Sequence, residues 1–375
     1  MNKWIKFAWV IGLVAFLAAC SSETASDDPA SNEETTEEGL EIYTTVYPLQ
    51  YFAEQIAGED ANVTSILPPG SDPHTFEPTT KEMISIAEAD LFIYNGAGLE
   101  AYAEQISETV EPEGVQILEA SKGLELTEHV HAEGEDEHAH EDEHAHEEEH
   151  AHEDEHAHEE EHAHEEEHAH EEEHAHEEEH AHEEEQTKED QTGHEGHNHG
   201  DQNPHVWLDP ILAAQMAENI KDQLVEINPD KEDTYQENFE NLQTKLQDLD
   251  QSFHDQLQEL PKNQIIVSHA AYSYWEQSYG LEQIAVSGLS PTSEPSQKEL
   301  ENIIEVASEN NLNHVLFEQN ITPKVSEVVR KELNAEALRI HNLSVLTEED
   351  IQNEETYFTL MEGNLEKLKE ALSGE

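Results

Sequence analysis

A tract of low complexity between residues 128 and 200 is the feature that most limits how this chain of 375 residues can fold. It holds 21 of the 27 histidines, 32 acidic residues and one lysine. Eight His-Ala-His triplets, each followed by three acids, give it a repeat of six residues. Such a segment has too few apolar side chains to offset the entropy lost on ordering, so we expect a disordered insertion. The globular part must then be assembled from the residues on either side of it.

The charge and the cysteine content of the chain exclude several classes of site. The sequence has 16 Lys and Arg against 89 Asp and Glu, a formal net charge of −73. Because proteins that bind nucleic acid need a basic surface to displace the counterions of phosphate, we expect no nucleic-acid partner. The single cysteine, Cys20, excludes an internal disulfide and zinc sites that need two or four thiolates.

Residues 1–19 predict a lipoprotein signal peptide. Two lysines precede an apolar run of 13 residues, Phe7–Ala19, which is shorter than the roughly 20 residues of a membrane-spanning helix. The run ends in LAAC, which resembles the lipobox of bacterial lipoproteins, in which the cysteine is lipidated. We therefore predict a lipid anchor at Cys20 and a disordered, acidic tether over residues 20–39. An ordinary signal peptide with an incidental cysteine is the alternative.

The segments that flank the tract alternate between strand and helix patterns, which predicts parallel sheets covered by helices. The expected strands are 41–47, 61–67, 91–94, 115–118, 264–268, 281–287, 314–317 and 335–340. The expected helices are 49–57, 81–89, 99–110, 271–279, 296–310, 322–333 and 349–372.

One long helix is expected between these two halves. From Tyr235 to Leu260 apolar residues recur every three or four positions, which predicts a single helix over about 228–261. We interpret it as a strut between two lobes; a projecting coiled-coil arm is the alternative. The predicted fold is α/β: two lobes, each a mostly parallel sheet flanked by helices, joined by one long rigid helix. The N-terminal lobe comprises residues 40–127 with 201–227, and the C-terminal lobe comprises residues 262–375.

Four side chains that could bind a metal follow predicted strands or lie in proline-containing turns: His74, His205, His269 and Glu318. In open α/β sheets, ligands bind beyond the carboxyl ends of the strands. Two candidates come from each lobe, which places the proposed site in one crevice. Three imidazoles and a carboxylate suit zinc, and four protein ligands would leave no position for a reacting water. The set therefore favours capture and release of a metal over catalysis.

These residues lie in motifs that together resemble a known family: GSDPHTFEPT, NPHVWLDP, VSHAAYSYW, SGLSPTSEPS and VLFEQN. They resemble the metal-binding lipoproteins of ABC importers, and most closely the zinc-uptake branch of the cluster of manganese and zinc receptors. The resemblance implies metal held between two lobes by the three histidines, with Glu318 in the fourth, acidic position, which water fills in some zinc members. Manganese members usually place Glu at the position of His269, so the third imidazole favours zinc. We expect Glu77, Asp209 and Glu294 to be turn, cap or supporting groups.

The resemblance also implies a function. We expect an extracytoplasmic receptor that captures Zn(II) as its transported ligand and delivers it to an ABC permease and its ATPase subunits. It would act as a monomer, lipid-anchored to the outer face of a bacterial cell membrane, and would not be an enzyme. The alternatives are a manganese-type receptor, a surface zinc store or adhesin built around the tract, and a zinc metallohydrolase with Glu318 as base.

The tract offers repeated pairs of histidines, which we expect to form weak, exchangeable zinc sites. Two histidines of one triplet point to the same side of an extended chain, and histidines four residues apart share one face of a helix. A purely solubilising acidic spacer is the alternative. The proposed auxiliary ligands are His138, His140, His144, His146, His150, His152, His156, His158, His162, His164, His168, His170, His174, His176, His180 and His182.

Overall fold

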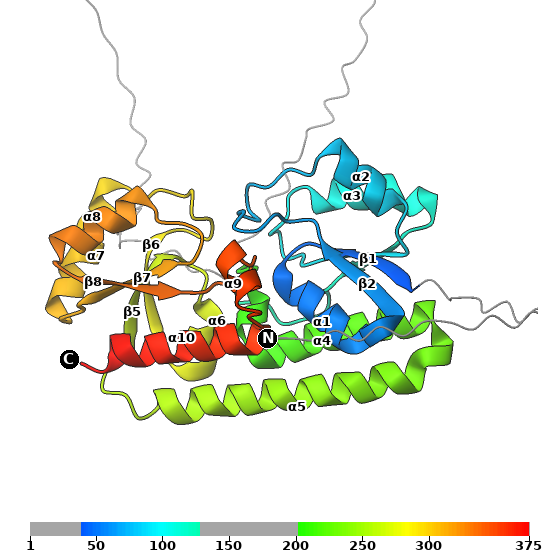
Figure 1. The fold of residues 1–375 in the computed structure, drawn as a ribbon. Helices are drawn as coiled ribbons and strands as arrows, with labels where there is room; N and C mark the ends of the chain where they lie inside the picture. The colour runs from blue at the N-terminus through cyan, green and yellow to red at the C-terminus, as the bar shows by residue number, and fades with distance from the viewer. Residues whose placement is uncertain (1–38, 128–201, 375) are drawn as a thin grey trace, which may run out of the picture. The chain divides into compact units, whose positions relative to one another are not determined.

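Two four-stranded parallel sheets form the framework of the computed structural model, which describes residues 39–127 and 202–374 (Figure 1). The first sheet has the order β2-β1-β3-β4 and the second the order β6-β5-β7-β8. The strands are β1 (Leu40–Thr44), β2 (Ala61–Ser65), β3 (Leu91–Tyr94), β4 (Gln116–Glu119), β5 (Gln264–His269), β6 (Glu282–Ser287), β7 (His314–Glu318) and β8 (Glu336–Ile340). All neighbouring strands are parallel, which confirms the predicted α/β fold with two parallel sheets.

Ten α-helices lie in the described part of the chain, and none of them is both long and apolar enough to cross a membrane. They are α1 (Tyr47–Ala57), α2 (Thr80–Ala87), α3 (Ala103–Val110), α4 (Pro210–Ile227), α5 (Glu232–Leu257), α6 (Ser273–Tyr279), α7 (Gln297–Glu309), α8 (Lys324–Glu332), α9 (Glu348–Gln352) and α10 (Tyr357–Leu372). The predicted signal peptide, the lipidation at Cys20, the tether up to residue 38 and the His/Glu tract lie outside the described residues.

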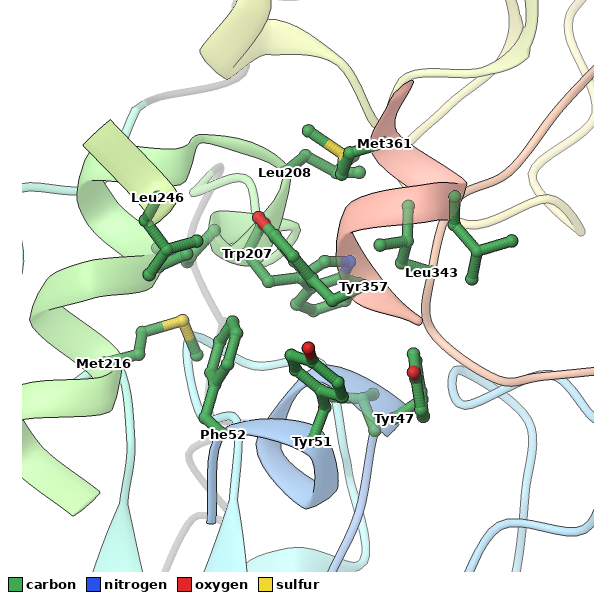
Figure 2. Packing of buried hydrophobic residues seen from close by; sticks show 14 of the residues in the cluster. Tyr47, Tyr51, Phe52, Trp207, Leu208, Met216, Leu246, Leu343, Tyr357 and Met361 are labelled. Atoms are coloured by element: carbon green, nitrogen blue, oxygen red, sulfur yellow. The ribbon is translucent and has the colours of Figure 1, made fainter. Parts of the chain in front are cut away.

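The largest hydrophobic core runs from one lobe to the other. It joins residues of α1, α4 and α5 to residues of β5, α6 and α10. Figure 2 shows its centre, where aromatic residues of α1 gather with Trp207 and with Tyr357 at the start of α10. The rings of Phe52 and Tyr357 are 5.1 Å apart, and the hydroxyl of Tyr357 donates to the carbonyl of Trp207 at 2.7 Å. Smaller clusters include residues of α2 and α3 in the first lobe and of α7 and α8 in the second.

Helix α5 carries the apolar stripe that the sequence predicts, and it contacts both lobes. The buried residues of this stripe are Tyr235, Phe239, Leu242, Leu246, Leu249, Phe253 and Leu257. The helix packs against α1 and α4 of the first lobe and against α6 and α10 of the second (Figure 1). These contacts favour a strut over a projecting arm. The α-helix is shorter than predicted, because residues Pro229–Lys231 form a 3-10 turn and α5 ends at Leu257.

Two further helical segments differ from the expectation. The helix expected over 349–372 is two helices, α9 and α10, because Glu354 adopts a left-handed conformation with φ of 55° that ends the first. The Thr356 hydroxyl then accepts from the amide of Thr359 and starts the second. Helix α4 was not predicted, although Asp209 and Pro210 form a clear start signal: Asp209 Oδ1 accepts from the amides of Ile211 and Leu212.

Candidate metal site

Three of the four predicted ligands come from different elements and meet between the two sheets. His74 lies in the turn after β2, where its amide donates to Oδ1 of Asp72 at 3.0 Å. His205 directly precedes the 3-10 turn Val206–Leu208. His269 is the last residue of β5, next to the point at which the order of the second sheet reverses. A site at this position is what the topology of parallel sheets leads us to expect.

The ring nitrogens of these histidines converge. Nε2 of His205 lies 3.3 Å from Nε2 of His74 and 3.2 Å from Nε2 of His269. Within the described ranges, these three residues form the only group of three or more potential metal ligands whose atoms all lie within 4.8 Å of one another. Two nitrogens bound tetrahedrally to zinc, each at about 2.0–2.1 Å from the ion, would be about 3.3 Å apart. The spacing therefore matches one tetrahedral ion.

Burial keeps two of the three imidazoles, those of His74 and His205, neutral. His205 and His269 are each 1% exposed. Burial, with a smaller contribution from the neighbouring His269, lowers the pKa of His74 to about 3. Burial likewise holds the pKa of His205 well below its ordinary value. Because only a neutral imidazole has a lone pair for a metal, the rings of His74 and His205 are ready to bind at neutral pH without first losing a proton.

Glu318, the fourth predicted ligand, lies at the other nitrogen of the His269 ring. It is the last residue of β7 and is 1% exposed. Its Oε1 is 2.5 Å from Nδ1 of His269 and accepts from the hydroxyl of Tyr272 at 3.3 Å. The structure thus brings the three histidines together and places Glu318 beside them, outside the three-histidine group. A carboxylate at Nδ1 of a metal-binding histidine orients the ring and makes Nε2 a stronger ligand.

Other residues of the same motifs have supporting or exposed positions. Asp209 caps α4 as expected, and Glu77 and Glu294 are exposed. Sequence reasoning missed Asn203, whose side chain lies against His205. The signal for it was the Asn-Pro pair immediately before the histidine, where a short side chain can bond to the backbone two residues further on.

A sequence profile of the zinc-uptake complex component A family, described as periplasmic, matches residues 42–371. The chain belongs to this family. Members of the zinc-uptake component A family are solute-binding receptors, not enzymes.

Characterised relatives cover nearly the whole chain. The zinc-binding lipoprotein AdcA of Streptococcus pneumoniae is 30% identical over 96% of the chain. The chain spans only 59% of the length of that relative. The high-affinity zinc uptake system protein ZnuA of Bacillus subtilis is 29% identical over 99% of this chain and 98% of its own length. The Zn(II)-bound ZnuA-like domain of S. pneumoniae AdcA superposes with a TM-score of 0.63 at 27% identity, covering 90% of this chain and 100% of that domain.

Proposed function

We propose that this chain is the zinc receptor of an ABC importer, which captures Zn(II) between its two lobes and releases it to the membrane permease. The observation that carries the proposal is the spacing of the three Nε2 atoms, 3.2 and 3.3 Å about His205. In this proposal His74, His205 and His269 are ligands to one ion. Zinc is the transported substrate in this proposal, which the names of the relatives support: one is called a zinc-binding lipoprotein and the other a zinc uptake system protein.

Glu318 completes the proposed ligand set. Its carboxylate is buried beside His269, so it can supply negative charge to balance a divalent ion in a site that is otherwise neutral. We infer that the carboxylate turns from Nδ1 of His269 toward the ion when zinc binds, with water as the competing fourth ligand. A crystal structure of the zinc-loaded protein, with the ion located by anomalous scattering, distinguishes the two arrangements, because it shows whether the carboxylate or a water occupies the fourth position.

The donor set also favours zinc over manganese. Three imidazole nitrogens are borderline-soft ligands that suit Zn(II), whereas Mn(II) prefers carboxylate, carbonyl and water oxygens. A competition titration in which each metal displaces the other from the same site tests this selectivity directly. Tighter binding of Mn(II) than of Zn(II) would contradict the proposal.

The partners and the location are part of the same proposal. An ABC permease with its ATPase subunits would accept the zinc, and a lipid on Cys20 would hold the receptor at the outer face of the cell membrane. Support comes from the LAAC sequence and from the S. pneumoniae relative, which is named a lipoprotein. Metabolic labelling with a fatty acid, compared between the wild-type protein and Cys20→Ala, tests the anchor.

The decisive experiment for the site is zinc affinity measured against a strong chelator, which masks weak sites elsewhere in the chain. His269→Ala removes one of three nitrogens and should weaken tight binding by at least two orders of magnitude. His254→Ala is the matched control, because His254 is a partly exposed histidine of α5 that contacts Asp250 and the Tyr279 ring. Equal affinities of the two variants would refute the assignment.

A further inference from the structure

Asn203 is fully buried where the chain returns from the tract, and each of its polar groups is engaged. Its amide donates to the carbonyl of Thr127 at 2.8 Å, and its carbonyl accepts from the hydroxyl of Tyr274 at 2.6 Å. Its side-chain nitrogen donates to the carbonyl of Ala270 at 3.0 Å and to the hydroxyl of Ser273 at 2.9 Å. Among the residues that the structure describes, the side-chain oxygen bonds only to His205.

The bonds to His205 fix the protonation pattern of that ring. Oδ1 of Asn203 accepts from the amide of His205 at 3.0 Å and lies 2.7 Å from Nδ1 of the same residue. An amide oxygen can only accept, so Nδ1 must carry the proton and Nε2 must carry the lone pair. This lone pair is on the nitrogen that lies 3.2–3.3 Å from the other two histidines.

The orientation of the Asn203 amide is determined by its neighbours. The backbone N–H of His205 can only donate, and the carbonyl of Ala270 can only accept. Rotating the side-chain amide by 180° would place its NH₂ group against the backbone N–H of His205 and its oxygen against the carbonyl oxygen of Ala270. The neighbours therefore determine which side-chain atom is Oδ1 and which is Nδ2.

The same side chain ties two elements of the site together. Ala270 directly follows His269, and Ser273 begins α6. Through Asn203, the position of the His205 ring is therefore set relative to the end of β5, which carries His269. The segment that holds His205 is also anchored independently, because Nδ2 of Asn95 donates to the carbonyl of Pro204 at 3.0 Å.

We propose that Asn203 is a positioning residue, which holds His205 in the Nδ1–H form and sets its Nε2 at ligand distance from His269. The inference rests on the proposed zinc site. It goes beyond that site because it attributes the zinc affinity of His205 to Asn203, which does not contact the ion. The loss of such supporting partners typically costs 10–100-fold in metal affinity.

Three variants of the full-length chain test the proposal by chelator competition with zinc and by thermal melting in excess chelator. Asn203→Leu removes the acceptor and should weaken zinc binding about 10–100-fold. Asn203→Asp keeps an acceptor at Nδ1 but loses both donations to Ala270 and Ser273, so it should melt earlier and lose less affinity than Asn203→Leu. The control is Asn364→Leu, since Asn364 is a buried asparagine that bonds to the backbone of His341, outside the site. A fall in affinity for Asn203→Asp as large as for Asn203→Leu would overturn the proposal, as would an equal fall for Asn364→Leu.

A measurement on the unmutated, metal-free protein keeps the proposal testable if Asn203→Leu does not fold. In ¹⁵N NMR spectra of the histidine rings, assigned by comparison with His205→Gln, His205 should be in the Nδ1–H form. Detection of the Nε2–H form would overturn the proposal. If His205→Gln binds zinc as tightly as the wild-type protein, the proposed zinc site fails, whereas the NMR result concerns Asn203 alone.

Discussion

A single buried carboxyl group ties together the loop that supports the first lobe's side of the site. Glu100 accepts from the hydroxyl of Thr45 at 2.6 Å and from the amides of Asn95 and Gly96 at 2.8 and 3.1 Å. Asn95 in turn bonds to Pro204, immediately before His205. Burial raises the pKa of Glu100 to about 7, although these hydrogen bonds act in the opposite direction.

This pKa predicts a specific pH dependence of stability. A carboxyl whose pKa rises from 4.5 in the unfolded chain to about 7 in the folded one binds more protons when folded. Its contribution to the free energy of unfolding is therefore complete below pH 4.5 and is lost as the pH rises to about 7, a change of about 3 kcal/mol. Glu100→Gln should gain stability relative to the wild-type protein by about this amount over that range.

Urea unfolding of the metal-free proteins at several pH values between 5 and 8 measures this change. Glu104→Gln, on the exposed side of α3, controls for the removal of one negative charge. A stability difference between Glu100→Gln and the wild-type protein that does not vary with pH would contradict the assigned pKa.

At the scale of single residues, the positions of the candidate ligands along the chain could be predicted from the sequence, but the directions of their side chains could not. The sequence places His269 and Glu318 at strand ends, because the apolar runs before them stop there. Which ring nitrogen faces the other histidines depends on side-chain torsions set by packing. The role of Asn203 depends on Ala270 and Ser273, which are about 70 residues away in the chain and have no local signature.

Among the elements, α4 connects the histidine segment to the core. It begins at Pro210, only five residues after His205, and Asp209 provides two hydrogen bonds to its first amides. Since the segment 203–209 is held between this cap and the Asn203 network, the stability of the helix start supports the position of His205. The cap is thus a structural requirement of the site, although Asp209 is not in the three-histidine group.

We predict that Asp209→Ala lowers the free energy of unfolding by about 0.5–2 kcal/mol, the range found for the loss of an N-cap. Asp209→Asn keeps a side-chain oxygen for the amides of Ile211 and Leu212, so it should lose much less. Chemical denaturation followed by circular dichroism measures both variants. Equal losses would show that the charge of Asp209, or its bond from Ser278, matters more than the cap.

The alternation of strands and helices could be predicted from the sequence, because apolar runs and turn residues are local signals. Strand order and the division between α9 and α10 were less accessible. The left-handed conformation of Glu354 ends α9 between two stretches that each look helical, and no glycine or proline marks the position. The order of the strands reflects pairing across the sheet, which a single sequence does not encode locally.

For the molecule as a whole, zinc should stabilise the native state. A ligand that binds only the folded chain adds RT ln(1 + [L]/Kd), about 4 kcal/mol at a thousandfold excess over Kd. The melting temperature should rise on addition of zinc and return to its starting value with a chelator. His269→Ala should lose most of this rise, and a variant that keeps it in full would contradict a site that links the two lobes.

Deletion of residues 129–199 should leave one tight zinc site per chain and remove additional weak binding. None of the four proposed ligands lies in the deleted range, and Thr127 and Asn203 are already joined by a backbone hydrogen bond. Zinc stoichiometry, measured by competition with a chromogenic chelator before and after deletion, tests this expectation. If the deletion abolishes tight binding, the ligand set is incomplete.

The bond between Thr127 and Asn203 also bears on how such a gene can change between generations. Because the tract departs and returns at one point, copying errors that add or drop a repeat of six residues do not alter the distance between its ends. Loop closure depends on the logarithm of length, so one more repeat would cost only about 0.1 kcal/mol. The number of histidines in the tract can then change while the two lobes stay the same.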